Sequence, residues 1–245
     1  MPNIFVDIET VPRYATKDEY LRVKNGIDQG SIHRNHPDRN IQNAYWKKIM
    51  GALNPIMGKV IMIAYQVNDC PTERLIEWES SESDILKKLY YIISSNKGSK
   101  DDPLNVIGFN ITTFDWPFLF SRCMSLEIKN GYNGHDPYWL YHYFHSANIQ
   151  DILSIHLPLN GFSRYGLNHN AVAMAYGFPT KGERGSVNTD YYYNEEYDKI
   201  LNYTEAEFIY PQLYKKMKDG LVSEKKLQES VEFWIKKYKK EREEK

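Results

Sequence analysis

The sequence of 245 residues has little of three features that would define special classes of protein. It has only two cysteines, Cys70 and Cys123, so no disulfide framework of the kind found in small secreted proteins is expected. It has no apolar run long enough to cross a bilayer, and its first residues lack a basic flank followed by an apolar stretch. We therefore expect an intracellular, cytoplasmic protein without membrane spans. The formal net charge of −1 neither demands nor excludes a nucleic-acid partner, because local charge matters more than the total.

The pattern of apolar residues predicts one α/β domain around a mixed sheet. A hydrophobic fraction of 42% is typical of a folded globular chain. Strands are predicted at residues 3–12, 59–67, 73–79, 104–111 and 147–155. Helices are predicted at residues 81–95, 116–126 and 166–177, twice between 195 and 217, and from 223 onward.

The chain divides into one domain at residues 1–221 and a C-terminal segment at 222–245. Residues 13–53 of the domain are predicted to form a helical insertion. From residue 13 to 58 eight Lys or Arg stand against four acids, a local balance of 8 − 4 = +4. The C-terminal segment is an amphipathic helix followed by a charged tail, and it is a candidate site for a protein partner or for self-association. Its apolar face carries Leu227, Val231, Trp234, Ile235 and Tyr238.

The first predicted strand, NIFVDIETVP from Asn3 to Pro12, carries two acids one pleat apart. Because alternate side chains of a strand point to the same face, Asp7 and Glu9 share a face and Ile8 lies on the other. Two neighbouring carboxylates repel each other, and burial makes that repulsion more costly. A divalent ion would remove the cost, since hard cations such as Mg²⁺ prefer carboxylate oxygens. The simpler alternative is a strand end that emerges into water.

Two later stretches contain further acids. In NVIGFNITTFDWPFLFSRC, residues 105–123, a hydrophobic strand leads into a helix that begins near Asp115. An acid beside a first-turn proline is also an ordinary helix start, so Asp115 alone does not indicate a site. In ILNYTEAEFIYPQLYKKM, residues 200–217, Tyr203 and Glu207 are four residues apart and share one helix face. Any amphipathic helix can show such a pair.

The order of these three motifs resembles that of the DEDD (DnaQ-like) exonuclease superfamily. D-x-E-T, G-x-N-x-x-x-F-D and Y-x-x-x-acid are most similar to its tyrosine-bearing branch, and within that branch to predicted 3'–5' exonucleases related to the proofreading domain of family B DNA polymerases. The resemblance extends from about residue 2 to residue 217, apart from part of the insertion. It implies a ribonuclease-H-like mixed sheet flanked by helices.

The resemblance implies a catalytic role for each matching residue. Asp7, Glu9 and Asp115 match metal ligands. Tyr203 matches the tyrosine that orients the attacking water, which is not an ordinary general base because an unperturbed tyrosine has a pKa of about 10. Glu207 stands where the family normally has aspartate. Glutamate is one methylene longer but is still a hard oxygen ligand.

The resemblance also implies two Mg²⁺ or Mn²⁺ ions, which would lie about 3.5–4 Å apart and neutralise the four carboxylates. One ion would activate a water and the other would stabilise the leaving 3' oxygen, so that the product is a nucleoside 5'-monophosphate. Because Glu207 departs from the family pattern, Glu205 and Asp198 are alternative ligands, although neither lies four residues after Tyr203.

Other residues near the motifs are expected to support the site. Thr10, Asn110 and Phe114 are candidates for the substrate groove, while Thr10 can equally end the strand and Asn110 can equally cap the turn that follows. Asp151, in IQDILSIH, matches an acid common at that point in such exonucleases and is expected to hold the structure around the site rather than to bind metal. The aromatic stretch at residues 132–145 would suit stacking of unpaired bases, or would pack beneath a loop.

Together these observations predict a metal-dependent 3'–5' exonuclease that releases nucleoside 5'-monophosphates from DNA, at single-stranded or frayed ends. A 3'–5' exoribonuclease is one alternative, because nothing in the motifs reads a 2'-hydroxyl. The other is a nucleic-acid-binding module on a nuclease fold with impaired catalysis. Glu207 argues for that module, whereas the retention of Asp7, Glu9, Asp115 and Tyr203 argues against it.

Overall fold

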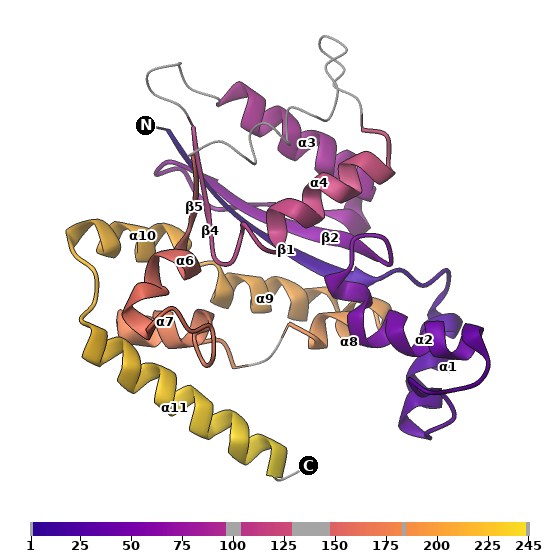
Figure 1. Ribbon diagram of the computed structural model, residues 1–245. Helices are drawn as coiled ribbons and strands as arrows, with labels where there is room; N and C mark the ends of the chain where they lie inside the picture. The colour runs from indigo at the N-terminus through magenta and orange to yellow at the C-terminus, as the bar shows by residue number, and fades with distance from the viewer. Residues whose placement is uncertain (1, 97–103, 129–147, 183–184, 244–245) are drawn as a thin grey trace.

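A five-stranded mixed sheet forms the centre of the computed structural model, which describes residues 2–96, 104–128, 148–182 and 185–243 (Figure 1). The strand order is β3-β2-β1-β4-β5. β1 (Asn3–Pro12) pairs antiparallel with β2 (Gly58–Val67) and parallel with β4 (Asn105–Gly108). β3 (Glu73–Ile76) extends β2 antiparallel, and β5 (Ile149–Asp151) extends β4 in parallel. The predicted α/β class is confirmed, and this sheet is compatible with the ribonuclease-H-like fold.

Helices cover both faces of the sheet (Figure 1). One face carries α3 (Glu82–Ser95) and α4 (Asp115–Ser125). The other carries α6 (Ile152–His156), α7 (His169–Ala175), α8 (Val187–Tyr193), α9 (Tyr197–Glu207) and α10 (Tyr210–Asp219). The insertion forms α1 (Lys17–Asp28), α2 (Arg39–Met50) and the 3-10 turn η1 (Gly51–Leu53), near the end of β1. Two further 3-10 turns are η2 (Glu77–Glu79) and η3 (Pro158–Asn160), and α11 (Glu224–Glu243) ends the described chain.

The alternation of side chains along β1 decides which face holds its acids. Ile4, Val6 and Ile8 pack with residues of α3 and α4 in one apolar cluster. Phe5 belongs to a second cluster, on the face covered by α6, α7 and α10. Because strand side chains alternate with a period of two, Asp7 and Glu9 lie on the same face as Phe5. The predicted common face is therefore confirmed, and it is the helix-covered face rather than a strand end in water.

Several predicted elements are shorter than expected, each for a local reason. The strand predicted at 147–155 ends at Asp151, because the Asp151 carboxylate accepts from the amides of Leu153 and Ser154 and so begins α6. The strand predicted at 104–111 ends at Gly108, two residues before Asn110 takes a φ of 59°. The strand predicted at 73–79 ends at Ile76 and continues as η2. Helix α8 was not predicted, and the aromatic stretch at 132–145 lies outside the described residues.

The C-terminal helix α11 packs its apolar face on the chain itself. Leu227, Val231 and Trp234 are buried, within the same cluster as residues of α7. Gly166 has a φ of 74°, and a Cβ there would lie 2.6 Å from Cδ1 of Ile235, so only glycine allows this approach. The structure accounts for this face without a partner, and self-association or partner binding through α11 stays a prediction.

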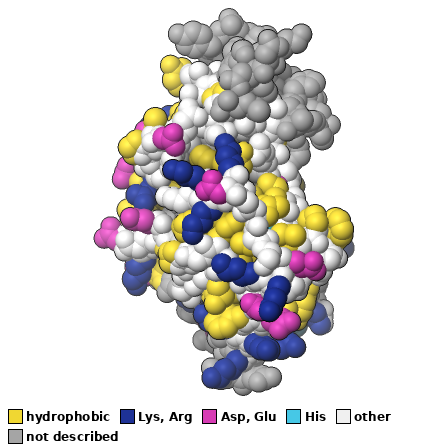
Figure 2. Space-filling model, turned by 90° about the vertical axis from the view of Figure 1, so that its left-hand side faces the viewer, with side chains coloured by type: hydrophobic (Ala, Val, Ile, Leu, Met, Phe, Trp, Pro, Cys, Tyr) yellow, Lys and Arg dark blue, Asp and Glu magenta, His cyan; other side chains and the backbone are white. Residues whose placement is uncertain are grey.

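On one side of the molecule, the described residues form no large region of a single charge (Figure 2). Figure 2 shows Lys and Arg side chains scattered there among hydrophobic and acidic ones. Within the described ranges, no helix is both long and apolar enough to cross a membrane.

Candidate active site

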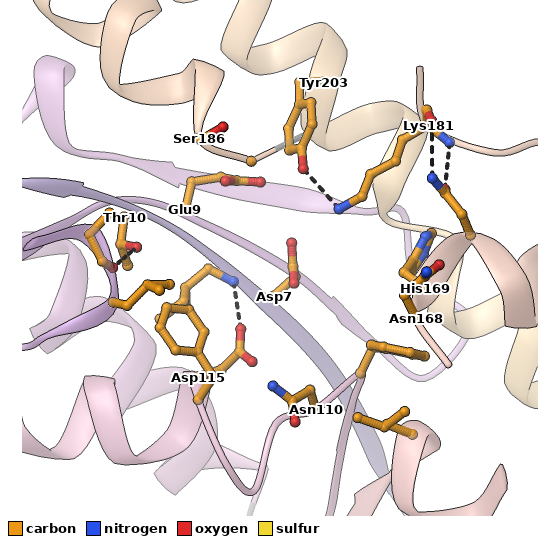
Figure 3. Close-up of a pocket in the computed structure, with 18 of the residues that line it drawn as sticks. Asp7, Glu9, Thr10, Asn110, Asp115, Asn168, His169, Lys181, Ser186 and Tyr203 are labelled. Carbon is orange, nitrogen blue, oxygen red and sulfur yellow. Dashed lines mark hydrogen bonds between the residues drawn. The ribbon is translucent and has the colours of Figure 1, made fainter. Parts of the chain in front are cut away.

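A cavity of about 730 Å³ opens beside the second half of β1, and three acids line it (Figure 3). Asp7 and Glu9 come from β1, and Asp115 is the first residue of α4. All three side chains are buried. The volume lies within the range of about 300–1,000 Å³ that is usual for small-ligand sites. The structure thus brings together three of the four acids that the sequence predicts.

Side chains from two distant helices hold the two acids of β1. The hydroxyl of Tyr210, at the start of α10, donates to Oδ1 of Asp7 at 2.9 Å. Nδ2 of Asn188, on α8, donates to Oε2 of Glu9 at 2.6 Å, and Oγ1 of Thr204 lies 3.4 Å from Oε1. Hydrogen bonds from donors to a carboxylate stabilise its charged form and fix its orientation. Both carboxylates are therefore oriented before any ion binds.

The position of Asp115 follows from the way β4 ends. Residues of β4 pair with β1 only as far as Phe5 opposite Ile107. A Cβ on Gly108 would lie 2.8 Å from the carbonyl oxygen of Val6, so glycine lets the end of β4 pass close to β1. Beyond that ladder, the amide of Ile8 donates to Oδ1 of Asp115 at 3.2 Å. The start of α4 is thereby held against β1 between the two acids.

Tyr203, on α9, lines the same cavity and is held by a lysine. Nζ of Lys181 donates to the hydroxyl oxygen of Tyr203 at 2.8 Å (Figure 3). The backbone of Lys181 is fixed in turn by Asn170, whose Oδ1 accepts from its amide at 2.9 Å and whose Nδ2 donates to its carbonyl at 3.2 Å. A tyrosine hydroxyl that accepts one hydrogen bond still has its own proton to donate. The arrangement presents that hydroxyl at the cavity wall in a fixed orientation.

Glu207 is the last residue of α9, so the helix predicted to carry both Tyr203 and Glu207 is confirmed. The side chain of Glu207 lies outside the described part of the structure, and its role stays a prediction. The two alternative ligands do not reach the cavity. Glu205 is mostly exposed and pairs with Arg74 at 3.6 Å, and Asp198 is exposed on the first turn of the helix.

All three residues predicted for the substrate groove line the cavity, although two are also engaged within the protein. Oγ1 of Thr10 donates to the carbonyl oxygen of Ala52 at 2.5 Å. Oδ1 of Asn110 accepts from Arg164 at 3.2 Å. Phe114 directly precedes α4. Their contact with a substrate stays a prediction.

Asp151 lies behind this cavity rather than in its wall. Its carboxylate accepts from the amide of Asn110 at 2.9 Å and from the hydroxyl of Thr112. These bonds tie the turn after β4 to the start of α6. A supporting role of Asp151 in the site stays a prediction.

The donor atoms in the cavity are of the type that hard divalent ions prefer, namely carboxylate oxygens without thiolates. Nevertheless, among the residues that the structure describes, no three His, Cys, Asp or Glu side chains form a group able to hold an ion. Mg²⁺ commonly keeps several waters and takes one or two carboxylates together with phosphate oxygens. The described acids therefore fit Mg²⁺ or Mn²⁺ shared with a substrate better than a closed metal cage.

Comparisons with known proteins give one informative result. No protein-family model matches the chain, and no curated protein does. Among solved structures, the chain is similar to the family B DNA polymerase of the hyperthermophilic archaeon Pyrobaculum calidifontis, with a TM-score of 0.52 and 16% identity. The match covers 89% of this chain and 24% of the polymerase chain. This likeness shows the fold alone. The chain therefore corresponds to about a quarter of that polymerase.

Sequence reasoning missed three residues of the site: Asn188, Lys181 and Tyr210. Asn188 and Tyr210 bond acids that lie 179 and 203 residues away in the chain. No local sequence pattern predicts such contacts, because they depend on the packing of α8 and α10 against β1 in the tertiary structure. Lys181 lies in GFPTKGERG, which has no phosphate-loop spacing.

Proposed function

We propose that this protein is a metal-dependent 3'–5' exonuclease that releases nucleoside 5'-monophosphates from DNA. The observation that carries the proposal is the meeting of Asp7, Glu9, Asp115 and Tyr203 at one cavity, on the strand and helices expected for the three motifs. Buried carboxylates are costly together unless cations or donors compensate them. A cavity lined by three buried acids therefore suits divalent metal ions better than an apolar ligand.

Asp7, Glu9 and Asp115 would hold the ions together with phosphate oxygens of the substrate. When bound, two divalent ions supply an activated water and charge stabilisation for the leaving 3' oxygen. The hydrogen bonds from Asn188 and Tyr210 keep the acids of β1 in place while an ion enters. The amide of Ile8 does the same for Asp115.

Tyr203 would orient the attacking water in line with the scissile phosphodiester bond. Its hydroxyl accepts from Lys181, which fixes the position of the hydroxyl at the cavity wall. Lys181 also places a positive charge near the phosphate that would enter. Holding a water and a phosphate in line is a large part of catalysis for such displacements.

The fold supports the choice of a nucleic acid as substrate. One similar solved structure is a family B DNA polymerase, a protein that acts on DNA. Because this chain matches only 24% of that polymerase, synthesis of DNA is not proposed. DNA is proposed before RNA on this likeness and on the motif resemblance together.

The test is digestion of oligonucleotides labelled at the 5' end, with Mg²⁺ or Mn²⁺ against a chelator. We expect stepwise shortening from the 3' end of single-stranded DNA, resistance of a strand blocked at its 3' end, and digestion of a strand blocked at its 5' end. Asp7→Asn should lose most turnover and remain folded, because removing one acid relieves repulsion in the metal-free site. Asp69→Asn, a change of an exposed turn acid, is the matched control.

The outcomes separate the alternatives. Faster digestion of an RNA strand of the same sequence would favour an exoribonuclease. Binding without digestion of any strand, with either metal, would favour a binding module. Equal activity of Asp7→Asn and the wild type would show that the site is elsewhere.

A further inference from the structure

The helix α2 and the turn η1 carry an apolar surface on the outside of the molecule, next to the cavity. Trp46, Ile49, Met50 and Leu53 follow the helical spacing i, i+3, i+4, i+7, and they are 41%, 48%, 42% and 58% exposed. We call these four residues the α2 ridge. No residue of α2 is buried. Because a surface helix normally turns its apolar face to the core, an exposed contiguous ridge indicates a binding surface.

The two lysines of α2 point toward the protein instead. Nζ of Lys47 lies 2.8 Å from Oε1 of Glu19 and 4.6 Å from the ring centre of Tyr14. Nζ of Lys48 lies 3.4 Å from Oδ1 of Asp190, on α8. These ion pairs attach α2 to α1 and α8 through its lysines. Because the lysines face the protein, the α2 ridge on the other side of the helix faces outward.

The ridge is also fixed to the strand that carries the acids. Thr10 follows Glu9 at an irregularity in the pairing of β1 with β2, and its hydroxyl donates to Ala52, within η1. A Cβ on Gly51 would lie 2.7 Å from Cβ of Pro12, so the absence of a side chain lets η1 approach the end of β1. Ile49 and Leu53 then line the same cavity as Asp7 and Glu9. The ridge and the acids form one continuous surface.

We propose that the α2 ridge binds the unpaired bases of a nucleic-acid strand whose 3' end enters the cavity. The inference rests on the proposed exonuclease function and names the substrate class of the same site, which is single-stranded. An unpaired base exposes a flat, weakly polar face that can stack on an indole and contact aliphatic side chains. In a duplex these faces are covered by neighbouring pairs. Two of the four ridge residues line the cavity, and this continuity favours the substrate strand over a second protein.

The test measures binding of a fluorescein-labelled 15-nucleotide poly-dT strand by anisotropy, in chelator, with the full chain. Base stacking on an aromatic residue contributes enough that Trp46→Ala should weaken single-strand binding about five- to hundredfold. Trp46→Phe, which keeps a flat ring, should retain most of the affinity. Binding of a blunt hairpin duplex should change little. Tyr91→Ala, which removes an exposed aromatic on α3, is the matched control, and thermal unfolding verifies that each variant is folded.

A second readout separates this inference from the proposed function. Hydrolysis of the 4-nitrophenyl ester of thymidine 5'-monophosphate with Mn²⁺ needs the acids but offers no further bases to the ridge. Trp46→Ala should therefore leave this hydrolysis unchanged and slow digestion of the strand. A wild type that binds the strand but hydrolyses neither substrate would refute the proposed function. The ridge proposal would then be tested by the anisotropy measurements alone.

Equal single-strand affinity of the wild type, Trp46→Ala and the double variant Trp46→Ala, Leu53→Ala would overturn the ridge proposal. So would a wild type that does not bind the strand at all. Loss of a dimer in the variants, measured by sedimentation with unchanged strand affinity, would also overturn it and assign the ridge to a second copy of the chain.

Discussion

Replacing Asn188 by leucine tests whether the acids of β1 are held ready for metal. Asn188 is fully buried, and its Nδ2 donates to Oε2 of Glu9 at 2.6 Å. The other oxygen of Glu9 has a longer contact, with Thr204 at 3.4 Å. Leucine has the same branched shape and the same number of side-chain heavy atoms as asparagine, so the change removes the donor without opening a cavity, although its two methyl groups are bulkier than the amide.

Two opposing terms set the effect on stability. Loss of a hydrogen bond to a charged group costs about 1.5–3 kcal/mol. Within the described part of the chain, however, Oδ1 of Asn188 has no hydrogen-bond partner, and an unsatisfied buried acceptor costs about 1–3 kcal/mol. Leucine removes that cost as well. These two terms nearly cancel, so the fall in unfolding free energy should come mainly from fitting the two larger methyl groups and amount to about 1–3 kcal/mol.

Metal affinity has no such cancellation. Removing a group that orients a ligand typically lowers metal affinity about 10- to 100-fold. Asn188→Leu should raise the Mn²⁺ concentration for half-maximal digestion by that factor, and calorimetric titration of Mn²⁺ should show the same change. Thermal unfolding of Asn188→Leu in chelator should show the change in unfolding free energy given above.

Asn160→Leu is the matched control. Asn160 is also buried, but its amide bonds the carbonyl of Ser163 and the side chain of Gln228, remote from the acids. This control should lose stability and keep the metal dependence of the wild type. If Asn188→Leu is folded and keeps that metal dependence too, the amide does not orient Glu9 and the reasoning is wrong.

Three further predictions concern other groups. Lys181→Met should lower kcat/KM about 10- to 100-fold, because Tyr203 loses a charged donor and the entering phosphate loses a nearby positive charge, and Lys181→Arg should recover part of the rate in steady-state digestion. Glu207→Ala should abolish most turnover. We expect the wild type to be more active with Mn²⁺ than with Mg²⁺, because Mg²⁺ demands stricter geometry, and Glu207→Asp should reduce that difference. An unchanged rate in Glu207→Ala would assign the fourth ligand to water. Burial lowers the pKa of His156 in the folded protein. Just below pH about 6.5, the histidine therefore takes up a proton in the unfolded chain but not in the folded protein. The unfolding free energy should then fall by up to about 1.4 kcal/mol for each unit by which the pH is lowered. Urea unfolding between pH 5 and 7 should show a smaller slope for His156→Gln.

Features set by near neighbours could be read from the sequence alone. The alternation of β1 placed Asp7 and Glu9 on one face because the pleat has a period of two, whatever the strand packs against. The amphipathic pattern at residues 81–95 offers Ser81 and Ser83 as caps, and Ser81 caps α3 by accepting from the amide of Asp84. The order of such elements was sufficient to predict an α/β sheet.

Features that depend on distant segments were decided only by the tertiary structure. The donors to Asp7 and Glu9 come from about two hundred residues further along the chain, where no local periodicity describes them. Glu205 and Tyr203 are two residues apart on α9, yet one faces Arg74 and the other faces the cavity, because a helix turns by about 100° per residue. The α2 ridge is the clearest case. Its pattern predicts an apolar face toward the core, but Glu19 and Asp190 pair with its lysines and turn that face outward, next to the acids of β1.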